Sequence, residues 1–337
     1  MFQKLLLIQI ILLTQLLAEN EVNIYSHRHY DTDKKLFKMF ESASGIKVNI
    51  VKADATQLIK RLESEGIYTP ADVLITVDVA RLVQAQQKDL LQAVKSDFLD
   101  SVIPQNLREK DGYWYGLTKR ARVIVYNKDK VNPEALSTYA NLTSKKWHKK
   151  VLIRKSNNIY NQSLLAAFIA SDGYEISKKW AKGMVNNMAR IPTGNDRDQM
   201  KAVAAGLGDI AVVNTYYVGK LLNSKKANEV EVGKRMGVFF PNQGVGERGV
   251  HINISGAGVV KYSKNRDNAI KFIEFLASKN AQKLFADANY EYPVNPNVEA
   301  SELLKSWGSF KEDDTPLEEF GINNANAAKI FNEVGWK

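Results

Sequence analysis

Cysteine is absent from the 337-residue sequence, and histidine occurs only four times. The lack of cysteine excludes disulfides, thiolate metal sites, catalytic thiols and a lipid-bearing cysteine at a processed N-terminus. None of the four histidines lies in an HExxH motif, and neither a GxSxG nor a GxxxxGK(S/T) pattern occurs. Hydrolase chemistry and nucleotide binding by a GxxxxGK(S/T) loop therefore have no local support, and we do not expect an enzyme.

Long apolar runs are also scarce, and the clearest one lies at the N-terminus. It extends over residues 5–17, follows Lys4 and precedes Ala18-Glu19-Asn20. A membrane-spanning helix needs about 20 apolar residues, so this shorter run is typical of a secretory signal peptide rather than of an uncleaved anchor. We predict that residues 1–18 are a signal peptide removed after Ala18, and that the mature protein diffuses freely in the periplasm.

The charge is positive but is spread along the chain. Lys and Arg number 47 against 37 Asp and Glu, which gives a formal net charge of +10. The densest basic run, KKWHKK at 145–150, could suggest nucleic-acid binding, but its pattern favours a solvated loop or helix face. We therefore expect no nucleic-acid partner.

Short β-branched runs alternate with amphipathic stretches from the start of the mature chain. Residues 22–26 and 47–53 are predicted strands, and residues 33–44 and 56–65 are predicted helices. The apolar run ADVLITV at 71–77 is typical of a parallel strand buried on both faces. This alternation predicts an α/β architecture with parallel strands.

The same alternation restarts after Gly112 and predicts a second lobe. No low-complexity linker and no repeat of 20–50 residues separates the two parts. Lobes joined by short strands can hinge about a cleft, where small ligands usually bind. The later predicted elements are strands at 120–127, 151–154, 208–214, 237–241 and 251–260, and helices at 161–171, 174–187, 265–277 and 281–288.

Tyrosine is the residue whose placement is unusual. Among 14 tyrosines, Tyr30, Tyr160 and the pair Tyr216-Tyr217 fall where predicted strands give way to helices. In open α/β sheets this edge forms the ligand crevice, and helix N-termini there stabilise negative charge. A half-buried tyrosine with one satisfied hydroxyl is the alternative interpretation for each of them alone. Their shared position favours a common site.

The cost of ionising a phenol indicates what such a cluster could bind. With a pKa near 10, ionising one tyrosine at neutral pH costs about 4 kcal/mol, and ionising three costs about 12 kcal/mol. Calcium and magnesium prefer carboxylates and carbonyls, and zinc prefers cysteine and histidine. Ferric iron, Fe3+, is a hard cation that matches phenolate oxygen. Three phenolates neutralise it and a fourth leaves one negative charge, which Arg120 could balance unless it only pairs with a surface acid.

The tyrosine pair also predicts local structure. Adjacent residues of a regular strand face opposite sides, so Tyr216 and Tyr217 can reach one ion only from a turn or a helix start. Asn214 and Thr215 are capping residues of the right kind to place a helix start there.

Five stretches of the sequence together resemble a known family. Their order and separations resemble those of the tyrosine-rich, transferrin-like ferric-iron-binding proteins that serve ABC-type importers in the bacterial periplasm. The resemblance covers essentially all of the mature chain, and the tyrosine pair is its most specific element. The stretches are NIYSHRHYDTD (23–33), ADVLITVDVARL (71–82), YGLTKRARVIVYNKD (115–129), SNNIYNQSLLAAFIA (156–170) and NTYYVGKL (214–221).

The resemblance implies a type II periplasmic binding protein fold, with two α/β lobes joined by hinge strands and a ligand cleft between them. We expect residues 19–118 and 250–298 to form the N-terminal lobe. Residues 119–249 and 299–337 are expected to form the C-terminal lobe.

The resemblance also implies a set of iron ligands. His29 would be an additional ligand that is not shared by all relatives, which differ in whether this histidine coordinates or yields to water or an anion. Arg120 matches an arginine just outside the metal shell, whereas Lys220 stands where some relatives carry another arginine, which weakens a second planar anion clamp. The tyrosine ligands would be Tyr30 in the N-terminal lobe and Tyr160, Tyr216 and Tyr217 in the C-terminal lobe.

The function implied by the resemblance is capture of Fe3+ in the cleft and delivery to an inner-membrane ABC permease. We expect a monomer that loads iron on the C-terminal lobe first, and a small anion could accompany the iron. One alternative keeps the fold and changes the cargo to an anion, a polyamine or a sugar. A secreted enzyme is the third interpretation, which lacks a nucleophile and base at recognisable spacing.

Overall fold

The computed structural model describes residues 20–28 and 30–337. The predicted signal peptide, residues 1–18, and the candidate ligand His29 lie outside the described residues. No helix in the described part of the chain is both long and apolar enough to cross a membrane.

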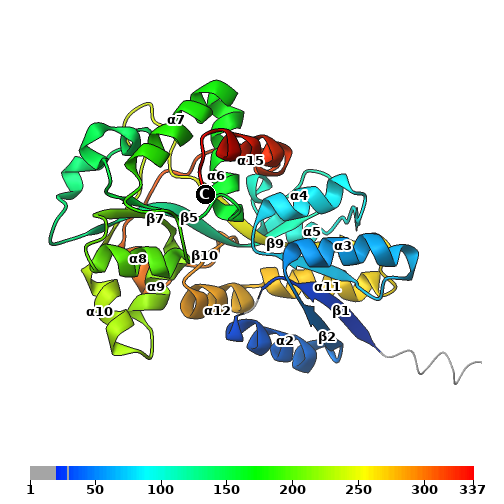
Figure 1. The fold of residues 1–337 in the computed structure, drawn as a ribbon. Helices are drawn as coiled ribbons and strands as arrows, with labels where there is room; N and C mark the ends of the chain where they lie inside the picture. Colours follow the sequence, from blue (N-terminus) through cyan, green and yellow to red (C-terminus); the bar gives the residue numbers. More distant parts are fainter. Residues whose placement is uncertain (1–19, 29) are drawn as a thin grey trace, which may run out of the picture.

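A mixed sheet of ten strands runs through the described residues (Figure 1). Its central order is β2-β1-β3-β9-β5-β7-β6, with β4 paired to β9 and with β8 and β10 paired to β5. The strands are β1 (Glu21–Ser26), β2 (Lys47–Lys52), β3 (Val73–Thr76), β4 (Leu91–Gln92), β5 (Tyr115–Asn127), β6 (Val151–Leu152), β7 (Ile210–Asn214), β8 (Met236–Phe239), β9 (Ile252–Val260) and β10 (Tyr292–Pro293).

The prediction of parallel strands is confirmed at the two outer parts of this sheet and is wrong at its centre. β1 runs parallel to β2 and β3, and β6 runs parallel to β7. In contrast, β9 is antiparallel to β3 and β5, and β5 is antiparallel to β7. A continuous apolar run indicates that both faces of a strand are covered, but it does not determine strand direction.

The long strand β5 connects the two parts of the sheet. Residues 115–121 pair with β9, whereas residues 122–127 pair with β7 and β8. Figure 1 shows helices α2, α3, α4 and α11 around one part and α7, α8, α9 and α10 around the other. Because one strand belongs to both parts, a change in its twist would rotate them relative to each other.

Helices cover the faces of the sheet. Gly45 ends the first helix in the left-handed region, with φ of 69°, and its N–H donates to the Glu41 carbonyl, as its position after a predicted helix suggested. The helices are α2 (Asp31–Ser44), α3 (Ala55–Glu65), α4 (Val79–Gln87), α5 (Asp97–Val102), α6 (Ile159–Asp172), α7 (Tyr174–Asn187), α8 (Asp196–Ala204), α9 (Thr215–Leu222), α10 (Ala227–Arg235), α11 (Arg266–Ala277), α12 (Lys279–Asn289), α13 (Glu302–Ser306), α14 (Glu319–Ile322) and α15 (Asn324–Glu333).

Two large hydrophobic cores lie on the two parts of the sheet. The first includes Ile24, Ile75 and Phe272, and the second includes Val125 and Val212. The C-terminal segment contributes to both cores: Leu317 and Phe320 join the first, and Ala327, Ile330 and Phe331 join the second. In Figure 1, α15 (red) accordingly lies beside α6.

Gly244, Gly246 and Gly249 have the spacing of the dinucleotide fingerprint GxGxxG, but their structural context differs. They lie in the loop between β8 and β9, and no helix begins there. The fingerprint requires a strand, a tight turn and a helix N-terminus that holds the pyrophosphate. The fold therefore does not support dinucleotide binding at these glycines.

Candidate metal centre

Each candidate tyrosine lies at the start of a helix. Tyr30 is the residue before α2, and Tyr160 is in the first turn of α6. Tyr216 and Tyr217 are in the first turn of α9, which begins directly after β7. Helix N-termini carry a partial positive charge, which favours a negative charge held close to them.

The predicted helix start at the tyrosine pair is confirmed, but the expected capping interaction is not formed. Asn214 occupies the N-cap position, and its side chain makes no capping hydrogen bond. Its Oδ1 accepts instead from Nη1 of Arg122 at 3.0 Å, and its backbone N–H donates to Oδ2 of Asp196 at 2.8 Å. The residue type at Asn214 allowed a cap, but the Asn214 side chain is hydrogen-bonded instead to the buried Arg122 on the neighbouring strand.

The four tyrosines meet in one place, although they come from three separate segments of the chain. The Tyr216 hydroxyl donates to the Tyr160 hydroxyl at 3.1 Å. The Tyr30 and Tyr216 rings stand edge to face with centroids 6.4 Å apart, and the Tyr216 and Tyr217 centroids are 4.3 Å apart. Tyr30, Tyr160 and Tyr216 are buried.

The environment of the tyrosines opposes ionisation in the absence of a cation. Burial raises the pKa of Tyr216 and Tyr217 well above the ordinary value, and the nearby Tyr160 raises both further. Burial also raises the pKa of Tyr30, with added contributions from Glu291 and Tyr160. The hydroxyls of Tyr30, Tyr216 and Tyr217 are therefore protonated at neutral pH, and a bound cation of high charge could offset the cost of removing these protons.

Three arginines surround the Tyr160 ring, with guanidinium carbons 5.6 Å (Arg120), 5.8 Å (Arg122) and 5.5 Å (Arg154) from its centroid. Arg120 is buried, donates to the Val77 carbonyl and pairs with the buried Asp78 at 3.3 Å. Arg120 thus lies beside Tyr160, and the acid that it pairs with is buried rather than on the surface.

Sequence reasoning missed Arg122 and Arg154 as neighbours of the site. Both pair with the fully buried Asp196, at 3.2 and 3.8 Å. The signal for Arg122 was present, because Arg120 and Arg122 are two residues apart on one strand and must share a face. The position of Asp196, on a helix far along the chain, carried no comparable signal.

Lys220 lies over the rings of two of the tyrosines. Its Nζ is 3.5 Å from the centroid of the Tyr30 ring and 5.2 Å from that of Tyr216. Burial lowers the pKa of Lys220 to about 8. The Lys220 ammonium is a single point charge, so it cannot form the planar, bidentate contact with an anion that an arginine guanidinium forms.

Two hollows adjoin the tyrosines, and Tyr217 lines both. One, of about 490 Å³, is lined among others by His27, Arg154 and Tyr160. The other, of about 650 Å³, is lined among others by Tyr30 and Lys220. In the described residues no group of three or more His, Cys, Asp or Glu side chains could hold a metal, so oxygen ligands from tyrosine are the donor set that this site offers.

The structure thus brings Tyr30, Tyr160, Tyr216 and Tyr217 together and places Arg120 next to them. His29 lies outside the described residues, so its role stays a prediction, as does the ligand role of each tyrosine.

Comparison with known proteins relates most of the chain to solute-binding proteins. Residues 68–311 match the family model described as bacterial extracellular solute-binding protein. The chain is 50% identical to iron uptake protein A1 of Synechocystis, over 95% of this chain and 88% of that protein. It is 28% identical to the major ferric iron-binding protein of Neisseria meningitidis, over 82% of each.

Solved structures agree with this comparison. The Trichodesmium protein IdiA (FutA) in complex with iron and citrate ligands superposes with a TM-score of 0.90 at 50% identity, covering 94% of this chain and 100% of that one. The ferric binding protein from Campylobacter jejuni has a TM-score of 0.90 at 45% identity, with 94% and 100% coverage. These similarities confirm the predicted fold class, an α/β fold of the type II periplasmic binding protein kind.

Proposed function

Because the chain belongs to the family of bacterial extracellular solute-binding proteins, we propose that it captures ferric iron between two lobes and delivers it to an ABC-type importer. The observation that carries this function is the contact among four tyrosine side chains that come from three segments of the chain. Relatives at 46–50% identity are iron uptake proteins, which agrees with iron as the cargo.

The proposed lobes are residues 19–118 with 250–298, and residues 119–249 with 299–337. The two hydrophobic cores and the division of β5 into two pairing halves support this arrangement. Leu317 and Phe320 pack in the first core, so the C-terminal segment also ties the lobes together.

In the proposed site Tyr160, Tyr216 and Tyr217 bind iron from the C-terminal lobe, and Tyr30 joins from the N-terminal lobe, with His29 as an additional ligand. The C-terminal lobe loads first, because its three tyrosines share one lobe and neutralise Fe3+ without closure. Tyr30 adds a fourth negative charge on closure. Arg120 is already paired with Asp78, so the nearby ammonium of Lys220 also helps to balance that charge.

The partner and the location follow from this function. The protein acts as a monomer in the periplasm after removal of residues 1–18, and it presents its closed form to an inner-membrane permease. It does not act as an enzyme. Iron leaves when the phenolates are protonated or when the metal is reduced, since Fe2+ binds hard phenolate ligands less tightly.

Visible spectroscopy tests the proposed function. Adding ferric citrate to the purified, metal-free protein should produce a phenolate-to-iron charge-transfer band at a stoichiometry of one iron per chain. Metal analysis of the protein as isolated should find iron in the same ratio. A colourless protein with no bound iron would contradict the assignment and favour a different cargo.

Iron binding should weaken as the pH falls. The phenols of Tyr30, Tyr216 and Tyr217 have raised pKa values and carry protons that iron must displace, so acid favours the metal-free form. Each displaced proton lowers the affinity by about tenfold per pH unit of acidification. Competition against a chelator of known protonation, between about pH 6 and 8, measures the slope. An affinity that does not change with pH would mean that no phenol is deprotonated on binding.

A further inference from the structure

Helix α9 carries more than the tyrosine pair on the side that faces the N-terminal lobe. Tyr216, Gly219 and Lys220 are three and four residues apart, so they share one face of the helix. Lys220 lies over the Tyr30 ring. Gly219 lies against Tyr290: a Cβ added at Gly219 would be 2.5 Å from Cγ, 2.6 Å from Cβ and 2.9 Å from Cδ2 of Tyr290.

These distances leave no room for any side chain at position 219. The atoms that would clash include the Cβ and Cγ of Tyr290, which are the root of the side chain rather than its flexible end. Carbon atoms pack at about 3.5–4.0 Å, so a methyl group at Gly219 would have to push the two segments apart by about 1 Å.

The backbone of Tyr290 is itself held in an uncommon conformation. Its φ is 60°, in the left-handed region that side chains rarely adopt, and it forms the turn between α12 and β10. Such a conformation persists where the surroundings fix it. The next residue, Glu291, supplies that restraint.

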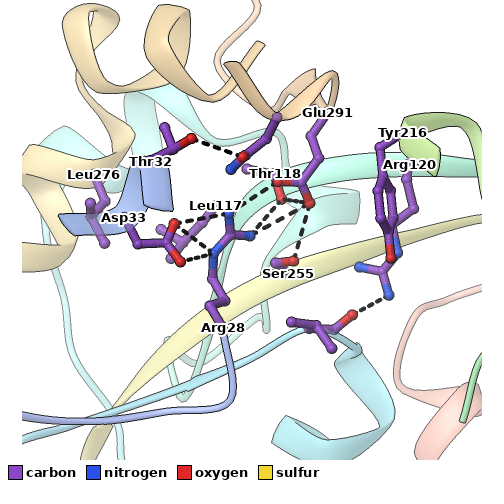
Figure 2. A network of polar contacts seen from close by, with 12 residues as sticks. Arg28, Thr32, Asp33, Leu117, Thr118, Arg120, Tyr216, Ser255, Leu276 and Glu291 are labelled. Carbon is purple, nitrogen blue, oxygen red and sulfur yellow. Dashed lines mark hydrogen bonds and ion pairs between the residues drawn. The ribbon is translucent and has the colours of Figure 1, made fainter. Parts of the chain in front are cut away.

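Glu291 belongs to a buried ion cluster drawn in Figure 2. Its carboxylate accepts from Arg28 Nη2 at 3.0 Å and from the Thr118 hydroxyl, on β5, at 2.9 Å. Arg28 also pairs with Asp33 at 3.2 Å, and its guanidinium carbon lies 4.9 Å from the centroid of the Tyr30 ring. One rigid cluster of the N-terminal lobe therefore fixes both Tyr290 and the segment that carries Tyr30.

We propose that Tyr290 packs directly against Gly219 when the lobes close. This contact sets the distance at which Tyr30 meets the tyrosines of the C-terminal lobe. The inference rests on the proposed function, in which the lobes close on iron. Gly219 and Tyr290 are positioning residues, because neither needs to touch the metal. A metal site tolerates displacements of only about 0.5 Å. A side chain at position 219 that separates the two segments by about 1 Å would therefore keep Tyr30 out of reach of the metal.

The test is a double-mutant cycle with the variants Gly219→Ala, Tyr290→Gly and their combination. Gly219→Ala should leave the charge-transfer colour of the three tyrosines on the C-terminal lobe, but iron should pass to a competing chelator about tenfold faster or more. Small-angle scattering should show incomplete compaction on iron loading. Alanine is the better helix former, so a weaker helix cannot explain these changes.

The Tyr290→Gly background shows whether faster iron release in Gly219→Ala comes from a steric clash with Tyr290 or from another cause. Glycine keeps the left-handed turn and removes the ring, so Gly219→Ala should add no further acceleration there. Gly244→Ala is the matched control, since an added Cβ at Gly244 meets only the Glu247 side chain, at 3.4 Å. Iron release that is unchanged by Gly219→Ala, or accelerated equally in both backgrounds, would contradict the proposed contact between Gly219 and Tyr290. A colourless unsubstituted protein would instead contradict the proposed function itself.

Discussion

Replacing Tyr216 and Tyr217 together by phenylalanine should abolish iron binding and its visible colour. The two residues supply half of the four phenols at the site, and with only Tyr30 and Tyr160 left a bound Fe3+ would keep an excess positive charge in a buried place. In a structural zinc site the total binding free energy of about 10–16 kcal/mol corresponds to about 2.5–4 kcal/mol for each of four ligands. By that scale the double change weakens binding by about 5–8 kcal/mol, on the order of 10⁴-fold or more.

The same substitution separates metal binding from stacking. Phenylalanine keeps the ring and its packing, so a sugar or another ligand held by stacking would still bind. Chelator competition and the ferric citrate spectrum measure the loss, and a melting curve checks that the fold survives. Tyr68→Phe is the control, because Tyr68 is 81% exposed and has no role in the proposed site. Retention of colour in the double variant, at wild-type intensity, would place the ligands elsewhere.

Replacing Arg28 by methionine should cause the largest loss of stability among single changes near the site. Arg28, Asp33 and Glu291 are all at most 2% exposed, and Arg28 contacts both carboxylates. Methionine keeps much of the volume and leaves two buried carboxylates without their cation. Breaking a buried pair in this way costs about 3–5 kcal/mol.

The loss should depend on pH in a defined direction. Burial alone would raise the pKa of Glu291, but the charge and hydrogen bonds of Arg28 hold this pKa below its ordinary value. Stability from such a lowered pKa is present above the unfolded value, near 4.5, and disappears as the pH falls through the folded value. The difference between wild type and Arg28→Met should thus be largest near neutral pH and smaller in acid.

Denaturant unfolding at several pH values measures this difference. Arg266→Met is the control: Arg266 pairs with Asp267 at 3.8 Å on the surface, and exposed pairs contribute at most about 1 kcal/mol. Equal losses in the two variants, or a loss for Arg28→Met that grows in acid, would show that the buried cluster is not the cause.

The positions of the tyrosines illustrate how far local pattern reaches. Each candidate was expected at the junction of a strand and a helix, and each is found there. The helix α7 has the predicted bounds, 174–187, and β7 was recognised from its apolar run. β5 begins at Tyr115, five residues before the predicted start. The prediction began too late because Gly116 and Lys119 interrupt the apolar pattern of the strand.

The amino-acid sequence by itself determined many of the helices and strands, the helix starts at the tyrosines and the residue type of the site, since hydrophobic period and helix-start signals act over a few residues. The tertiary structure alone decided which side chains meet. Arg28 and Glu291 are 263 positions apart, and the antiparallel centre of the sheet, the arginines around Tyr160 and the fit of Tyr290 on Gly219 all join distant segments. Such contacts depend on how strands pair and helices pack, which no short stretch of sequence encodes.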